Sequence, residues 1–249
     1  MKKQNLFFLT LAALSVSLNA CSSPSSEGAK KTGWDLELLK GKVKSIKIEE
    51  YDAVEKDGAL EKTALWKTGY HTFDKDGHTI SYVEDSPYGH AEMTCTYEQD
   101  KMIRKLDMDG DIIISEVTFT SWGDYQTEVC ERWHKQTEYR YNDQQQLVEQ
   151  KDYYEGDLES RMEYYEYDAS GRDTKSVRYN SNGVEESTYY HTYNEQGDVI
   201  EYRVSRPYGE LVNRYTYQYD DHGNYIRREC LSTNPNYCKI EECTIEYYE

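Results

Sequence analysis

The sequence is poor in the residues that usually build a hydrophobic core. The whole chain has only 4 Phe and 4 Pro, and no long hydrophobic run follows residue 20. Leu, Ile, Val and Phe together make up only about 15% of residues 21–249, a level that is typical of disordered chains when net charge is high. The lack of a second hydrophobic run predicts that no helix after residue 20 spans a membrane.

Positive charge is also scarce. The chain carries 29 Lys and Arg against 47 Asp and Glu, a formal net charge of −18. This acidic excess repels phosphate backbones. We therefore exclude nucleic acid as a partner.

Short catalytic motifs are missing as well. We find no HExxH, P-loop, nucleophile elbow, dinucleotide glycine pattern or CxxC. We predict no enzyme activity, no cofactor and no metal site, with a secreted hydrolase using a carboxylate pair as an alternative. The run Asp107 to Asp111 is a candidate calcium loop, but Lys105 stands where the first ligand belongs, so we favour an acidic β-turn.

Tyrosine is what the sequence has in abundance, with 26 residues, all after residue 20. A tyrosine ring can be buried while its hydroxyl stays hydrated. The tyrosines also recur at fixed spacing, which a disordered chain would not need. We therefore expect a folded protein held by aromatic surface on sheets, without a thick aliphatic core.

The spacing defines a 26-residue repeat. Its anchors are followed at once by Asn or Asp and, four positions after the anchor, by glycine in three of four cases; the anchors are Tyr141, Tyr167, Tyr193 and Tyr219. Asn or Asp starts a turn by bonding the backbone, and glycine accepts positive φ. The motif predicts strand, tight turn, strand, with a second turn in mid-repeat at 154–156, 181–183 and 207–209. Weaker units precede these at Phe73, Tyr97 and Phe119.

Two segments, YEYDASGRDTKSVRYNSNGVEE and YTYQYDDHGNYIRREC, carry a family resemblance. They resemble the tyrosine-aspartate (YD) repeats of Rhs proteins, and the mid-repeat turns resemble variant MORN repeats. The opening LLKGKVKSIKIEEYDAVEKDG resembles the start of small repeat lipoproteins of Bacteroidetes. The resemblance implies a repeat sheet, but the chain has no Rhs core or toxin, and about seven units are too few for a closed shell.

From the repeat we predict an all-β domain over residues 34–249. Its expected form is an elongated, curved antiparallel β-meander of about seven tyrosine-anchored units, with a short helical turn near Trp34 to Leu39. Ile46 and Ile48 alternate with charged residues, as a half-buried strand would.

The first twenty residues predict export. Lys2 and Lys3 precede a hydrophobic run that is too short to span a bilayer, and Leu18-Asn19-Ala20-Cys21 resembles a lipobox. We predict a signal peptide over 1–20, lipidation of Cys21 as a membrane anchor and a flexible tether over 21–33. Ser22 and Ser23 give no acidic retention signal, so we predict an outer-membrane lipoprotein, facing either the periplasm or the outside.

Five cysteines follow the lipidation site, and an exported protein can form disulfides. A hairpin centred on Asn234 would place Cys230 and Cys238 opposite each other, so we predict a disulfide there, with free packed thiols as the alternative. The pairing of Cys95, Cys130 and Cys243 stays open.

These features predict a binding protein, and they leave its ligand open. The sheet recognises either a protein partner, of immunity or scaffold type, or a glycan on an aromatic face. Tyr202, Arg203, Arg206 and Tyr208 are our candidate binding patch, since Tyr and Arg often anchor interfaces. Exposed sheet edges could also pair between copies, which predicts self-association as a further option.

Overall fold

The computed structural model describes residues 38–98, 101–109, 112–122 and 125–249. This part of the chain forms sixteen strands: β1 (Val43–Lys56), β2 (Ala59–Phe73), β3 (Thr79–Ser86), β4 (Gly89–Glu98), β5 (Lys101–Asp109), β6 (Ile112–Trp122), β7 (Tyr125–Cys130), β8 (Lys135–Tyr141), β9 (Leu147–Tyr154), β10 (Asp157–Tyr167), β11 (Asp173–Asn180), β12 (Glu185–Tyr193), β13 (Val199–Arg206), β14 (Gly209–Tyr219), β15 (Tyr225–Ser232) and β16 (Lys239–Tyr247). Two 3-10 turns, η1 (Glu131–Trp133) and η2 (Pro235–Tyr237), interrupt them.

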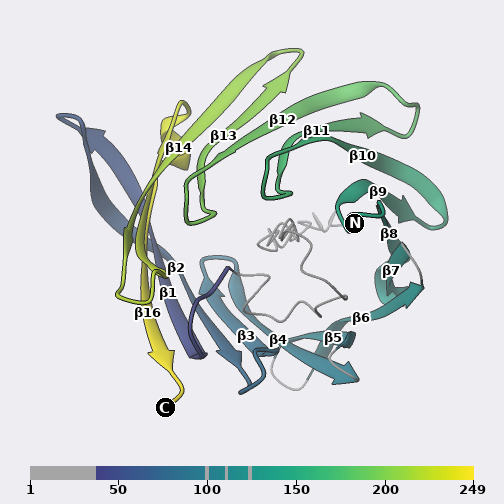
Figure 1. Cartoon of the computed structure of the whole chain (residues 1–249), viewed down its shortest axis with the longest axis horizontal. Helices are drawn as coiled ribbons and strands as arrows, with labels where there is room; N and C mark the ends of the chain where they lie inside the picture. The colour runs from purple at the N-terminus through teal and green to yellow at the C-terminus, as the bar shows by residue number, and fades with distance from the viewer. Residues whose placement is uncertain (1–37, 99–100, 110–111, 123–124) are drawn as a thin grey trace, which may run out of the picture.

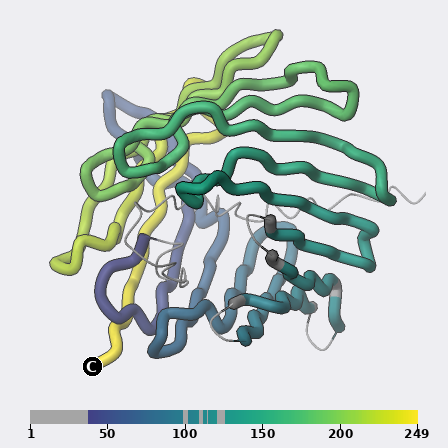
Figure 2. Tube along the Cα trace, turned by 45° about the vertical axis from the view of Figure 1, so that its right-hand side comes forward, coloured from purple at the N-terminus to yellow at the C-terminus, as the bar shows by residue number. Residues whose placement is uncertain are grey.

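The strands close into a barrel. Each strand pairs antiparallel with the next, and β1 pairs with β16 over a register from Val43↔Tyr247 to Asp52↔Lys239 (Figures 1 and 2). The all-β class and the hairpin order agree with the sequence prediction, and β1 confirms the strand around Ile46. The elongated open meander of about seven units was wrong, because the first and last strands pair with each other. The helical turn near Trp34 falls almost entirely outside the described residues.

One end of the barrel carries the predicted Tyr-Asp-x-x-Gly turns. We call it the Asx rim, and its described turns begin at Asp74, Asn142, Asp168, Asn194 and Asp220. In the third of them, Asp168 Oδ1 accepts the amides of Ser170 and Arg172 at 2.9 and 3.0 Å, and Gly171 N donates to the Asp168 carbonyl. Gly171 has φ 78°, a conformation that glycine adopts at little cost. The sequence prediction of strand, turn, strand is confirmed here.

The same rim explains why the sheet closes. The register shifts beside six anchors, which are Phe73, Tyr97, Tyr141, Tyr167, Tyr193 and Tyr219. A β-bulge bends its strand and increases the local twist. Repeated at nearly every turn on one rim, bulges coil the sheet progressively until its edges meet.

Tyrosines on the strands beside this rim also tie neighbouring hairpins together. Tyr193 Oη donates to the carbonyl of Asp173 at 2.9 Å, and Tyr217 Oη donates to that of Val199 at 2.7 Å. Across the β1–β16 seam, Tyr248 Oη donates to the Phe73 carbonyl at 2.7 Å. The tyrosine ties therefore continue around the closed rim.

Among the described residues, two small clusters of buried hydrophobic side chains lie near the seam. One contains Val43, Ile46 and Phe73, and the other contains Ala53, Cys238 and Ile240. This agrees with the sequence expectation of a thin aliphatic core. A barrel of sixteen strands is in any case wider than side chains alone can fill.

Candidate functional site

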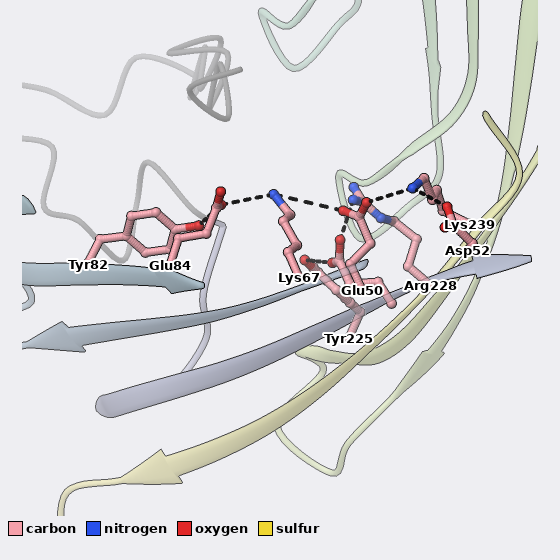
Figure 3. Close-up of polar contacts among 9 residues, drawn as sticks. Glu50, Asp52, Lys67, Tyr82, Glu84, Tyr225, Arg228 and Lys239 are labelled. Atoms are coloured by element: carbon pink, nitrogen blue, oxygen red, sulfur yellow. Dashed lines mark hydrogen bonds and ion pairs between the residues drawn. The ribbon is translucent and has the colours of Figure 1, made fainter. Parts of the chain in front are cut away.

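The inner wall beside the seam carries a chain of charged side chains. Glu50 of β1, Lys67 of β2 and Glu84 of β3 project into the lumen together (Figure 3). Lys67 Nζ lies 3.2 Å from Glu84 and 3.9 Å from Glu50. On the other side, Lys239 Nζ of β16 lies 3.5 Å from Glu50 and 2.6 Å from Asp52. Barrel closure brings these four strands side by side.

A second group continues the chain on β15 and β16. Arg228 Nη2 lies 2.7 Å from Glu241, and Tyr225 Oη donates to the other oxygen of that carboxylate at 2.7 Å. Burial, reinforced by the Glu241 charge, holds the pKa of Tyr225 well above its usual range. Burial alone would lower the pKa of Arg228, but Glu241 holds it well above its usual range. Glu241 therefore holds two buried groups in fixed positions.

Tyr82 reaches this group because a glycine lies beneath it. A Cβ at Gly69 would be 3.1 Å from a carbon of the Tyr82 ring, so only glycine leaves room for the ring to cross β2. The Tyr82 hydroxyl donates to Glu84. Burial first, and then this carboxylate, raise the pKa of Tyr82.

Two recesses adjoin on this wall and share Arg228 and Glu241. The larger has a volume of about 280 Å³ and is lined by Glu50, Asn213, Tyr215, Arg228, Cys230, Tyr237, Lys239 and Glu241. The smaller contains Lys67, Gly69 and Tyr82 among its lining residues. We call the larger one the seam recess.

The seam recess combines three kinds of lining. Tyr215 and Tyr237 contribute aromatic rings, and Tyr237 is 52% exposed. Two cations, Arg228 and Lys239, are each paired with a carboxylate of the same lining. Asn213 Oδ1 is one of four buried side-chain polar atoms without a hydrogen-bond partner among the described residues. The recess is thus aromatic, balanced in charge and able to accept a hydrogen bond.

The outer face of the same strands is different. Glu242, next to Glu241 but on the opposite face, pairs with Lys62 and Arg227, each at 2.5 Å. Similar exposed ion pairs recur around the wall: Arg104–Glu116, Arg140–Glu149, Lys175–Glu166 and Arg214–Glu201. Side chains alternate between the two faces of a strand. Because Glu50 and Glu241 face the lumen, the residues next to them in sequence, such as Glu242, face outward.

The structure holds both cysteines of the predicted disulfide, Cys230 and Cys238, as thiols. The ladder pairs Cys230 with Lys239, so Cys238 is offset by one position. Such an offset turns a side chain to the other face: Cys230 lines the seam recess, while Cys238 packs with Ala53 and Ile240. Cys95 and Cys130 are also thiols. The bridge stays a prediction that peptide mapping of the oxidised protein can test.

The candidate binding patch is not a single surface. Tyr202 stacks against His191 with ring centroids 5.1 Å apart, whereas Arg203 lies over the Tyr190 ring on the next position of the ladder and so on the other face. Tyr208 is 83% exposed at the turn. The structure therefore separates residues that are neighbours in sequence.

Several other sequence predictions meet the structure only in part. Of the candidate calcium segment, Asp107 lies on β5 and pairs with Ser115 of β6, whereas residues 110 and 111 lie outside the described residues. Among the described residues no group of three or more His, Cys, Asp or Glu is arranged to hold a metal ion. No helix in this part of the chain is long and apolar enough to cross a membrane. Cys21, the signal peptide and the tether lie outside the described residues.

Comparison with known proteins finds no matching family model and no curated relative. Among solved structures, a porin-like protein from Bacteroides uniformis is 11% identical with a TM-score of 0.45, covering 82% of this chain and 98% of its own. A porin-like protein from Bacteroides vulgatus is 10% identical with a TM-score of 0.36, covering 83% and 98%. The Photorhabdus luminescens Tc holotoxin pore is 14% identical with a TM-score of 0.23, covering 66% and 10%.

These findings correct the family resemblance drawn from the sequence. No YD-repeat or MORN family model matches. The chain forms a closed barrel of sixteen strands and not an elongated repeat sheet. The tyrosine-turn motif therefore describes local hairpins, and assigning the chain to YD, Rhs-like or MORN-like repeats was wrong.

The sequence analysis missed the charged inner wall altogether. Its residues come from two segments nearly 150 positions apart, 50–84 and 225–241, and only closure brings them together. One signal was available in the alternation of Ile46, Ile48 and Glu50, which places a carboxylate on the same face as two aliphatic residues. That pattern marks an unusual inner face but does not identify its partners.

Proposed function

We propose that this chain is a non-enzymatic binding protein that holds a neutral, hydroxyl-rich ligand of the carbohydrate class in the seam recess. The observation that carries the proposal is the lining of the recess, where two tyrosine rings and an unsatisfied amide oxygen lie beside paired charges. Ligand sites commonly combine aromatic walls with a few fixed polar groups. With a volume of about 280 Å³, the seam recess is small for a ligand pocket.

The balance of charge favours a neutral ligand. Arg228 and Lys239 are cationic, and each already faces a carboxylate of the lining, Glu241 or Glu50. A charged ligand would have to compete with one of these pairs and leave its partner unpaired, which is costly in a partly buried site. A sugar hydroxyl can donate to a carboxylate of the lining without breaking either ion pair.

The tyrosines favour a ring-shaped ligand with apolar faces. Tyr215 and Tyr237 offer large rigid surfaces whose hydroxyls can still hydrogen-bond. A saccharide ring has apolar C–H faces for such contacts and hydroxyls around its edge. Recognition of a protein partner stays an alternative. It has less support, because the residues of the candidate binding patch do not form one continuous surface.

We further propose that the barrel stands in water as a lipid-anchored outer-membrane protein and does not span the bilayer. A membrane-spanning barrel needs an outward apolar band about 25 Å tall. Here the described outer wall carries ladders of ion pairs, such as those around Glu242. The lipobox at Cys21 supplies the predicted anchor. Closure also removes the sheet edges that suggested self-association.

Thermal and chemical unfolding with added neutral saccharides tests the ligand proposal. The probes are glucose, galactose, mannose, maltose and cellobiose, with citrate and spermidine as charged comparisons. A saccharide at one hundred times its Kd raises the free energy of unfolding by about 2.7 kcal/mol. We expect at least one saccharide to stabilise the protein and neither charged probe to do so.

Paired variants localise that effect. Tyr215→Ala removes a ring from the seam recess and should weaken saccharide binding about tenfold, since one aromatic contact contributes roughly 0.5–1.5 kcal/mol beyond its buried area. Tyr165→Ala is the matched control, because Tyr165 is 49% exposed and lies on the outer wall. Equal weakening by both variants, or stabilisation by the charged probes alone, contradicts the proposal.

A further inference from the structure

The end of the barrel opposite the Asx rim carries a ring of exposed hydrophobic side chains. We call these residues the tip crown, and each lies in or next to a different hairpin turn: Tyr88, Ile112, Trp133, Tyr154, Val184 and Tyr208. Their exposed fractions run from 42% at Tyr154 to 83% at Tyr208. Six of the eight hairpins at this end contribute one such residue, and Tyr237, at a seventh, lines the seam recess.

The Asx rim has a different surface. Its described turns hold no exposed large hydrophobic residue of their own; Leu38, 43% exposed, lies against the turn of Gly197, and Ile80, Ile200 and Ile226 lie on the strands that follow these turns. Hairpin tips are usually polar, because they face water on several sides. Repeated exposure of hydrophobic residues at one end only indicates a surface that is covered in use.

From this asymmetry we propose that the tip crown docks on the surface of a zwitterionic phospholipid bilayer, with only the turn tips entering the interface. These residues all lie at one end of a meander barrel. Four of the six are Trp or Tyr, which prefer the membrane–water interface. The charged outer wall directly behind the tips prevents deeper insertion.

Charge selects the kind of bilayer. Glu155 and Asp157 follow the Tyr154 tip, and Glu185 and Glu186 follow the Val184 tip, whereas Arg132 and Lys135 flank Trp133. These carboxylates would be repelled by anionic headgroups. A zwitterionic surface allows the aromatic tips to enter without that repulsion.

Chain length permits this orientation together with a lipid anchor. Residues 22–37 can extend over at most roughly 55 Å. The 14-residue strand β1 spans about 46 Å along its own direction, and less along a tilted barrel axis. An acylated Cys21 could therefore share the bilayer that the tip crown contacts, although β1 begins at the other rim. The docking itself needs no acyl chain.

Vesicle flotation tests the proposal with the full mature chain carrying Cys21→Ser, so that no acyl chain contributes. We expect the protein to float with phosphatidylcholine vesicles, and to float less when a third of the lipid is phosphatidylglycerol. The triple variant Trp133→Ser, Tyr154→Ser, Tyr208→Ser should lose about tenfold or more in partitioning. Absence of flotation by the parent protein, or stronger binding to the anionic vesicles, overturns the proposal.

A matched triple variant controls for general loss of hydrophobic surface. Tyr70, Ile80 and Tyr165 are 42–49% exposed and lie on strands away from the tip crown, and Tyr70→Ser, Ile80→Ser, Tyr165→Ser should change partitioning less than twofold. An equal loss in both triples also overturns the proposal. If the tip-crown triple fails to unfold cooperatively, Tyr208→Asp alone replaces it, since this side chain is 83% exposed. Saccharide binding at the seam recess should survive in Tyr208→Asp, which separates this inference from the proposed function.

Discussion

The two faces of one strand, β16, show how this barrel differs inside and outside. Glu241 and Glu242 are adjacent, yet the Glu241 side chain is 7% exposed and the Glu242 side chain is 35% exposed. Glu241 faces the lumen and holds Arg228 and Tyr225, whereas Glu242 faces out and joins exposed ion pairs with Lys62 and Arg227. The same residue type therefore has a fixed structural role on one face and a hydrated one on the other.

That difference indicates where the specificity of the fold resides. Exposed ion pairs contribute little because water and salt screen both charges. Inside, desolvation makes each unpaired group costly, so partners must be matched one to one. A wall with exposed ion pairs on the outside and ordered polar pairs on the inside agrees with the proposed binding site in the lumen.

The largest expected effect comes from breaking the inner pair. Glu241→Ala leaves Arg228 buried without a counter-charge and removes the acceptor of Tyr225, so we expect a loss of about 3 kcal/mol in the free energy of unfolding. Urea denaturation at neutral pH measures it. Glu242→Ala is the matched control and should cost under about 1 kcal/mol. Similar costs for the two variants would falsify the distinction between the faces.

A smaller effect is expected at the tyrosine ties of the Asx rim. Tyr193→Phe removes the hydroxyl that donates to the main-chain carbonyl of Asp173. Asp173 is buried, with 1% of its surface exposed. We expect a loss of about 1 kcal/mol, the net contribution of one such hydrogen bond. Tyr165→Phe on the exposed outer wall should cost less than half of that. If Tyr193→Phe leaves the free energy of unfolding unchanged, the tyrosine hydrogen bonds at the rim do not stabilise the pairing of the strands.

Local structure was predictable from the sequence because it depends on residues close together in the chain. The pattern of Tyr167, Asp168 and Gly171 specifies a turn through an Asx acceptor and a positive φ, and both are present. The mid-repeat turn at Tyr154-Glu155-Gly156 likewise joins two paired strands. Turn chemistry of this kind acts over five residues and needs no tertiary information.

Closure was not predictable from the same pattern. Whether a meander stays open or closes depends on the twist that its strands accumulate, and β-bulges add to that twist. One such bulge lies between β8 and β9, where Arg140 pairs with Glu149 but Tyr141 pairs with Leu147. No residue type identifies such a shift. The inner wall could not be predicted either, because Lys239 meets Glu50 only after β16 has paired with β1.

The smallest effect we predict depends on pH and concerns the turn at Asp220. Burial alone would raise the pKa of Asp220, but hydrogen bonds from Tyr247 and from the amides of Asn224 and His222 leave it below its usual value. A carboxyl group whose pKa is lowered on folding stabilises the protein above its unfolded pKa of about 3.9, and this contribution is lost as pH falls through the folded pKa. Stability should therefore decline as the solution is acidified below about pH 4.

Asp220→Asn isolates this contribution, because asparagine already fills the same position in a sister turn. There Asn194 Nδ2 donates to Tyr219 Oη at 2.7 Å, so an amide at 220 can still bond Tyr247 Oη and accept the turn amides. Urea unfolding at pH 7, 5, 4 and 3 should show the variant slightly less stable at pH 7 and equal to the parent near pH 3. If the difference in stability between Asp220→Asn and the parent protein is the same at every pH, the charge of Asp220 does not contribute to stability. The hydrogen bonds of the turn would then stabilise it equally well with an amide at this position.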